Sequence, residues 1–175
     1  MKADWASVWA TLISTVVGAA IALLVVYVNL KNTRSVELQR ERRYMMNQLA
    51  GLMDSVLTAL KDIKQIAELE QFDVLAVYIH RFRDKLGVMA ELYNSNQLLM
   101  APTLHKTMDS LLARYRKADN DFYIAIDHRG EYIFLVDDPE RRARFFARLE
   151  DAIKTTSTGT ARTMKIMRQV TGVQS

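Results

Sequence analysis

The sequence predicts an all-α protein, in which one N-terminal transmembrane helix continues into a cytoplasmic, antiparallel bundle of about four helices. Residues 6–30 contain no charged side chain. After them, apolar residues recur at steps of three and four, which is the spacing of one helix face. The two prolines, Pro102 and Pro139, stand where helices can begin. We therefore divide the chain into a membrane anchor (1–30), a basic juxtamembrane stalk (31–43) and a bundle domain (44–175).

The uncharged segment is long enough to cross a lipid bilayer. As a helix with about 1.5 Å of rise per residue it reaches about 37 Å, whereas the hydrocarbon core is about 30 Å thick. Trp5, Trp9 and Tyr27 stand near its ends, where aromatic rings favour the headgroup level. Buried helices of soluble proteins rarely lack a polar stripe over such a length. A cleaved signal peptide has a shorter apolar stretch and a small-residue cleavage site, so we expect an anchor that is retained.

The charges that flank the span predict its orientation. Five basic residues follow it closely: Lys31, Arg34, Arg40, Arg42 and Arg43. Basic flanks stay in the cytoplasm, so we expect a single-pass inner-membrane protein with its N-terminus outside and its C-terminal domain in the cytoplasm. The same cluster should attract anionic lipids of the inner leaflet, by about 1 kcal/mol per basic residue near the surface. The absence of cysteine is compatible with a reducing compartment.

Small residues form a row along the span. Ala10, Ser14, Gly18 and Ala22 recur every four residues, and a neighbouring row of Ser, Thr and Ala runs beside them. Small side chains at this spacing let two transmembrane helices approach closely. The row therefore predicts association of the span with another copy or with a partner helix; the alternative is that such common residues fall into rows by chance.

Four helices are predicted for the bundle domain, each with one apolar face. The first face contains Met45, Leu49, Leu52, Val56, Leu60, Ile63 and Ala67. The second has the spacing of a bundle seam or short coiled coil and contains Phe72, Leu75, Ile79, Phe82, Leu86, Met89 and Tyr93. The third, which follows turn residues at 94–96, contains Leu104, Met108, Leu111, Tyr115, Ala118, Phe122 and Ile126.

The last helix should begin at Asp138-Pro139 and bury Phe146, Leu149 and Ile153, with Met164 and Met167 further on. Two segments leave alternatives open. Residues 123–136 are read as a helix with a kink or loop near Gly130, or else as a small hairpin that turns there. In residues 155–160, the run of Thr, Ser and Gly either breaks the last helix or lets another helix come close.

No motif in the sequence supports catalysis or a cofactor. His80, His105 and His128 are far apart in the sequence and cysteine is absent, so a zinc site would need several distant residues to meet. The glycines are isolated from one another, so no phosphate-binding glycine loop is present. No Glu-x-x-His pair of the di-iron bundle type occurs. We therefore predict neither a bound metal nor a cofactor, and we do not expect an enzyme.

The C-terminal segment is strongly basic. Residues 139–175 carry eight basic and three acidic side chains, a net charge of +5 against +4 for the whole chain. Its basic residues predict a face for lipid or for an acidic partner, with a merely solvated bundle face as the alternative: Arg141, Arg142, Arg144, Arg148, Arg162, Lys165 and Arg168. Nucleic acid is not expected, because the nearby aromatic residues are better placed in the core.

These observations favour a non-enzymatic membrane protein that acts by association. It would form a homo-oligomer, or serve as an accessory or scaffold subunit of a membrane complex, with itself, another membrane protein and membrane lipids as partners. The alternative is a membrane effector of toxin or defence type, whose assembled spans form a pore lined by Ser7, Thr11, Ser14 and Thr15. A third class, an enzyme or sensor with a ligand in the bundle core, would need a cavity with converging polar groups.

Overall fold

In a computed structural model, which describes residues 5–122 and 138–171, the chain is helical. No strand occurs within these ranges, which confirms the all-α prediction. The elements, in chain order, are α1 (Trp5–Glu68), α2 (Phe72–Ser95), the short 3-10 helix η1 (Gln97–Leu99), α3 (Pro102–Phe122) and α5 (Pro139–Thr171). The segment 123–136, for which a hairpin and a helix were both considered, lies outside the described residues.

The chain divides into two compact units, 1–41 and 42–175. The first unit contains the N-terminal part of α1, which is the one helix in the described ranges that is long and apolar enough to cross a membrane. Every side chain described in this unit, from residue 15 onward, is exposed. Large apolar side chains such as Leu23 (70% exposed) and Leu24 (65%) are therefore not covered by any described part of the chain.

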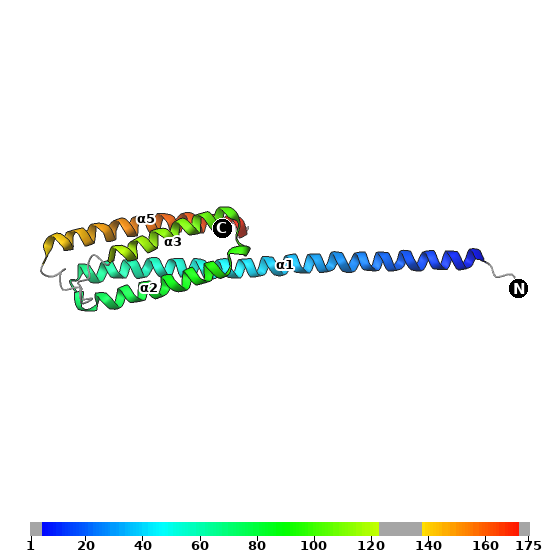
Figure 1. The fold of residues 1–175 in the computed structure, drawn as a ribbon, viewed down its shortest axis with the longest axis horizontal. Helices are drawn as coiled ribbons and strands as arrows, with labels where there is room; N and C mark the ends of the chain where they lie inside the picture. Colours follow the sequence, from blue (N-terminus) through cyan, green and yellow to red (C-terminus); the bar gives the residue numbers. More distant parts are fainter. Residues whose placement is uncertain (1–4, 123–137, 172–175) are drawn as a thin grey trace. The chain divides into compact units, whose positions relative to one another are not determined.

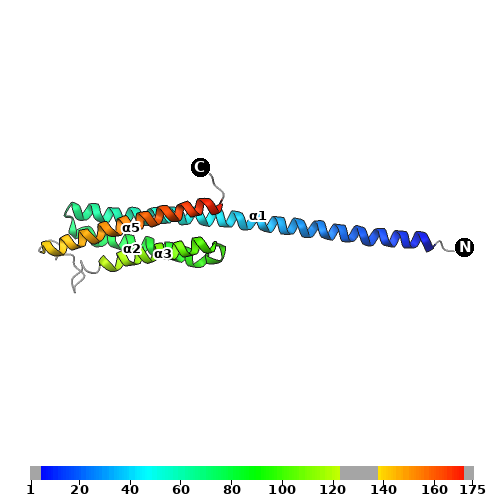
Figure 2. The same ribbon diagram turned by 90° about the horizontal axis from the view of Figure 1, so that it is seen from above.

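The second unit is an antiparallel helical bundle. Residues 42–68 of α1, then α2, α3 and α5 run alternately up and down, side by side in both views (Figures 1 and 2). All four helices contribute to one apolar core. The core has aromatic side chains at its centre, where Phe82 packs edge-on against Phe122 with ring centroids 5.6 Å apart. Helix pairs that follow each other in the chain and share a core are typical of up-and-down bundles.

Most of the predicted apolar faces are buried. All seven seam residues of α2 are buried, as are the predicted residues of α3 through Phe122. On α1 the prediction was wrong at Leu52, which is half-buried, because Met53 occupies the core instead. On α5, Leu149 and Met167 are buried as predicted, whereas Phe146, Ile153 and Met164 are only half-buried and pack against the core. There the buried face contains Phe145, Leu149, Ala152, Thr156, Gly159, Thr160, Thr163 and Met167.

The helix ends follow capping rules. The side chain of Asp138 accepts a hydrogen bond from the Arg141 backbone N–H at 3.0 Å, as predicted for the start of α5. After α1, the Glu70 N–H donates to the Ala67 carbonyl and the Gln71 N–H to the Ile66 carbonyl. With Glu70 at a φ of 55°, this is a Schellman turn built on a residue other than glycine. It reverses the chain into α2.

The run of Thr, Ser and Gly at 155–160 does not break α5. It forms the close contact between α5 and α3: a Cβ added at Gly159 would lie 2.9 Å from Leu111 Cδ1. The hydroxyls of Thr156 and Thr163 are buried and donate to carbonyls four residues earlier in α5, at 2.6 and 2.8 Å. Because these hydroxyl groups are hydrogen-bonded within their own helix, burying them costs little free energy. Threonine and glycine can therefore stand at this interface in place of large apolar residues.

Tyr115 of α3 connects all four helices. Its ring is buried next to Phe82 of α2, with centroids 6.2 Å apart. Its hydroxyl lies 3.0 Å from Thr160 Oγ1 of α5 and 3.5 Å from the Met53 carbonyl oxygen of α1. Burial raises the pKa of Tyr115 to about 12, so its hydroxyl is neutral in the folded protein.

We predict that Gly159→Val destabilises the bundle by about 1–3 kcal/mol, because the added atoms would force apart the packed helices α3 and α5. The matched control is Gly87→Val on α2, where a Cβ would meet nothing within 4 Å. The control should change the free energy of unfolding by less than about 0.5 kcal/mol. Urea unfolding of the detergent-solubilised chain, followed by circular dichroism, measures both; equal losses would contradict the close contact.

We predict that stability falls as the pH rises above about 10. The unfolded tyrosine ionises near pH 10, whereas folded Tyr115 ionises near pH 12. The contribution of Tyr115 to the free energy of unfolding is therefore complete below pH 10. It is lost between about pH 10 and 12, at up to about 1.4 kcal/mol per pH unit. Tyr115→Phe should flatten this decline, although loss of the hydroxyl contacts costs about 1 kcal/mol at neutral pH.

Urea midpoints measured between pH 8 and 11.5 test this prediction. Tyr44→Phe is the control, since Tyr44 is 66% exposed, and it should keep the wild-type slope. A second group also makes the free energy of unfolding fall at alkaline pH, in the wild type and in the Tyr115→Phe variant alike, because burial and neighbouring Asp109 raise the pKa of Tyr93. A Tyr115→Phe slope identical to that of wild type would show that Tyr115 is not the buried group responsible.

Candidate functional site

The small-residue row predicted to mediate association lies on α1 in the first unit. Side chains are described from residue 15, so the structure places Gly18 and Ala22 but not the side chains of Ala10 and Ser14. Gly18 and Ala22 are exposed, and a Cβ added at Gly18 would meet no heavy atom within 4 Å. In the described part of the row, Gly18 and Ala22 thus form a notch of small side chains beside exposed larger ones such as Val17, Ile21 and Val25.

The basic flank that follows the apolar segment divides between the two units. Lys31, Arg34, Arg40 and Arg43 are exposed, as a lipid-facing cluster requires. Arg42 is half-buried instead, and its Nε donates to the Leu99 carbonyl oxygen at 2.8 Å. Arg42 therefore connects η1 to α1 within the bundle. Its Nε–H group is engaged by the Leu99 carbonyl and is not available to lipid.

The arginines at the start of α5 are engaged within the bundle. Arg142 pairs with Glu70 at 2.9 Å, Arg148 with Asp121 at 3.0 Å, and Arg141 with Asp138 at 3.4 Å. Arg144 donates to the Glu140 carbonyl in its own helix. These four residues were predicted as part of a face for lipid or a partner. The structure gives three of them acidic partners, which neutralise much of that face.

The three basic residues in the C-terminal half of α5 differ from this group. The side chains of Arg162, Lys165 and Arg168 are exposed and form no hydrogen bond or ion pair within the described part of the chain. Their charge is therefore available to other molecules. Arg162 lines a groove between α3 and α5, whereas Arg168 lines a different one against α1. The structure does not gather the seven predicted residues into one continuous site.

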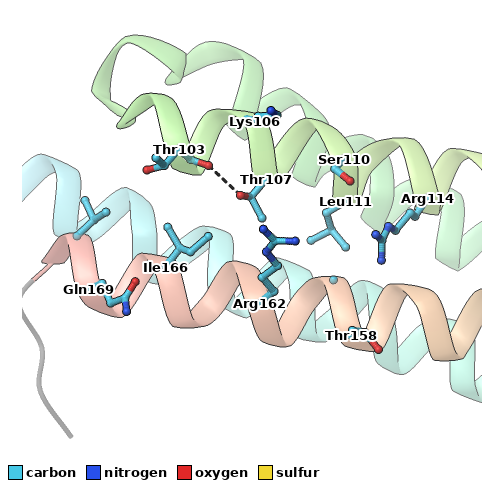
Figure 3. Close-up of a pocket in the computed structure, with 12 residues that line it drawn as sticks. Thr103, Lys106, Thr107, Ser110, Leu111, Arg114, Thr158, Arg162, Ile166 and Gln169 are labelled. Atoms are coloured by element: carbon cyan, nitrogen blue, oxygen red, sulfur yellow. Dashed lines mark hydrogen bonds between the residues drawn. The ribbon is translucent and has the colours of Figure 1, made fainter.

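A groove of about 570 Å³ lies between α3 and the C-terminal half of α5 (Figure 3). Leu111 and Gly159, the pair at the closest approach of the two helices, belong to its lining. Three basic residues line it: Lys106 and Arg114 from α3 and Arg162 from α5. None of the 12 lining residues is acidic, and four carry hydroxyl groups.

The two arginines reach into the groove from opposite helices. The guanidinium of Arg162 extends from α5 toward α3, beside Thr107 and Leu111, and that of Arg114 extends from α3 toward α5 (Figure 3). Arg114 Nη1 donates to the Thr155 carbonyl oxygen at 2.8 Å, which fixes this side chain across the interface. Its other N–H groups remain for a ligand. Arrays of this kind bind oxyanions.

The sequence reasoning missed Arg114 and Lys106. A signal existed, because Lys106, Ser110 and Arg114 recur every four residues and are all exposed on α3. This pattern by itself fits any solvated helix face. What singles it out is the neighbouring Arg162, and sequence spacing cannot show which helix lies beside α3.

A second polar cluster joins α2 to α3. The Tyr93 hydroxyl donates to Asp109 Oδ1 at 2.6 Å, and His105 Nδ1 lies 3.0 Å from Asp109 Oδ2. Burial, together with the neighbouring carboxylate, raises the pKa of Tyr93 above its usual value, so this hydroxyl stays protonated and serves as a structural donor. Within the described ranges, no three His, Cys, Asp or Glu residues are grouped closely enough to hold a metal ion.

Comparisons with known proteins identify no relative: no family model, no curated protein and no solved structure matches this chain.

Proposed function

We propose that this chain is a single-span membrane protein that acts by association and not by catalysis. Residues 6–30 would cross an inner membrane with the N-terminus outside and the bundle in the cytoplasm. Association would occur through the span, either between copies of the chain or with a larger membrane complex that it serves as an accessory subunit. The exposed surface of α1 around Gly18 and Ala22 is the observation that carries this proposal.

The contrast between the two units supports it. The bundle buries its large apolar side chains in a core of its own, whereas the apolar window of α1 has no buried residue at all. Lipid tails can cover such a surface, but they fill a notch between bulky side chains less well than a second helix does. Close backbone packing at small residues is a principal source of affinity between transmembrane helices.

Basic residues on the exposed flank support the orientation. Lys31, Arg34, Arg40 and Arg43 are exposed, so each can reach the headgroups of the inner leaflet. The polar contacts of the bundle also have structural explanations: Tyr93 and Tyr115 join helices, and the acidic residues around α5 pair with its arginines. Such contacts favour a binding module over an enzyme.

We predict that Gly18→Ile combined with Ala22→Leu weakens association at least tenfold. The added side chains fill the notch and keep a second backbone at a distance. The control is Val16→Ile combined with Ala20→Leu, which adds bulk at similar depth on the opposite face of the helix. Extraction in polymer-bounded nanodiscs followed by native mass spectrometry, with crosslinking in intact membranes, measures the assemblies.

The mass also tells which kind of association occurs. A species at a multiple of 20.1 kDa means a homo-oligomer, and co-extracted subunits at fixed stoichiometry mean an accessory role. If the notch-filling variant assembles as well as wild type, the proposed contact is wrong. A homo-oligomer whose induced expression collapses the membrane potential would instead identify a pore-forming effector.

A further inference from the structure

We propose that the groove between α3 and α5 is a binding site for a phosphate-bearing anion, and that its ligand is the headgroup of an anionic phospholipid. The groove holds about 570 Å³, which is enough for a small headgroup. Nothing in the proposed association through the span requires such a site. It is a separate binding activity of the bundle.

The charges of the groove favour an oxyanion. Arg114 and Arg162 enter it from opposite helices (Figure 3), and Lys106 adds a third cation. The nearby carboxylate of Asp109 does not compensate for them, because it is held on the other side of α3 by Tyr93 and His105. A guanidinium group is planar and binds phosphate oxygens with two parallel N–H donors, and the groove contains two such groups.

Hydroxyl groups complete the polar lining. The hydroxyls of Thr107 and Thr158 already donate to carbonyls within their own helices, at 2.8 and 2.9 Å. Ser110 has no hydrogen-bond partner among the described residues, so its hydroxyl is available to donate to a ligand. The groove thus presents donors from both helices, and its lining contains no carboxylate that would compete with an anionic ligand for them.

The rest of the lining favours a lipid over a small soluble anion. Ile166 and Val170, both half-buried, line the same groove toward the C-terminal end of α5. A free phosphate would leave these apolar side chains in contact with water, whereas the glycerol and the first methylenes of a lipid would cover them. Along α5 the lining passes from Arg162 to Ile166 and Val170, with Gln169 between these two. The groove thus offers cationic contacts for a phosphate and apolar contacts for the first methylenes of a lipid.

The position of the groove within the bundle agrees with this ligand. Thr103, at one end of the groove, stands in the first turn of α3, four residues after Leu99 of η1, whose carbonyl accepts a hydrogen bond from Arg42. The C-terminal end of α5 also lies against Met46 and Asn47 of α1. This is the end at which the chain enters the bundle after the linking residues 31–41, and Leu98 is fully exposed there. The lipid source rests on the proposed membrane location; the phosphate site itself does not.

The test compares two double variants that remove the same charge from the same helices. Arg114→Gln with Arg162→Gln removes the two guanidinium groups that face the groove. Arg116→Gln with Lys154→Gln removes two exposed basic groups that do not line it. Circular dichroism and urea midpoints verify that both variants keep the helical bundle.

Two ligand probes distinguish the source of the phosphate. The full chain in dodecyl maltoside is titrated with phosphatidylglycerol or phosphatidylcholine, and native mass spectrometry counts the lipids retained per chain. In parallel, thermal unfolding is measured in inorganic phosphate and in chloride at equal ionic strength, since a ligand that binds the folded state raises its stability. We expect one phosphatidylglycerol per chain, bound at least tenfold more tightly than phosphatidylcholine.

The groove variant should lose this preference at least tenfold, and the control should stay within twofold of wild type. Stabilisation by inorganic phosphate without a preference for phosphatidylglycerol would support the phosphate site but overturn the lipid as its ligand. Equal losses in both variants, or no binding of either probe, would overturn the site. The inorganic phosphate result does not depend on where the chain resides, so it is separable from failure of the membrane proposal.

Discussion

The close approach of α3 and α5 is the constraint on which much of the bundle depends. It exists because α5 presents glycine and threonine where the other helices present leucine, methionine and aromatic rings. Gly159 lets Leu111 pack against the α5 backbone, and this brings Thr160 within 3.0 Å of the Tyr115 hydroxyl. Tyr115 in turn contacts α1 and α2. A larger residue on the α5 face would thus disturb contacts in three other helices, since packed interiors transmit strain.

This interface buries less apolar surface than a leucine-rich one, and polar contacts around α5 supplement it. Lys64 of α1 lies 2.8 Å from Glu150, and Arg142 and Arg148 pair with Glu70 and Asp121. Exposed ion pairs of this kind contribute only about 0–1 kcal/mol each. Their value lies in placement, because together they fix the register of α5 against α1 and α3. Three of the N-terminal arginines of α5 are paired in this way, whereas Arg162, Lys165 and Arg168 in its C-terminal half have no acidic partner among the described residues.

The sequence predicted the elements whose faces are made of large apolar residues. The seam of α2 is buried residue by residue, because steps of three and four among Phe, Leu, Ile and Met leave one choice of face. On α5 the same reasoning was only partly right: Leu149 and Met167 are buried, but Phe146 and Ile153 are half-buried, and small residues make up much of the buried face. The Arg42 contact and the groove could not be predicted from the sequence, for a different reason. Both join residues from distant parts of the chain, and periodicity within one helix does not show which helices meet.

The same small-residue face that closes the bundle also creates its groove. Because α3 and α5 are in contact at Leu111 and Gly159, side chains longer than these cannot enter the interface and must lie along its edge. Arg114 and Arg162 therefore project into one shared space instead of into solvent on separate helices. A ligand that bridges them adds its binding free energy to the contact between α3 and α5. Ligand binding and the stability of this helix pair are thus coupled, because Leu111 and Gly159, which join the two helices, also line the groove.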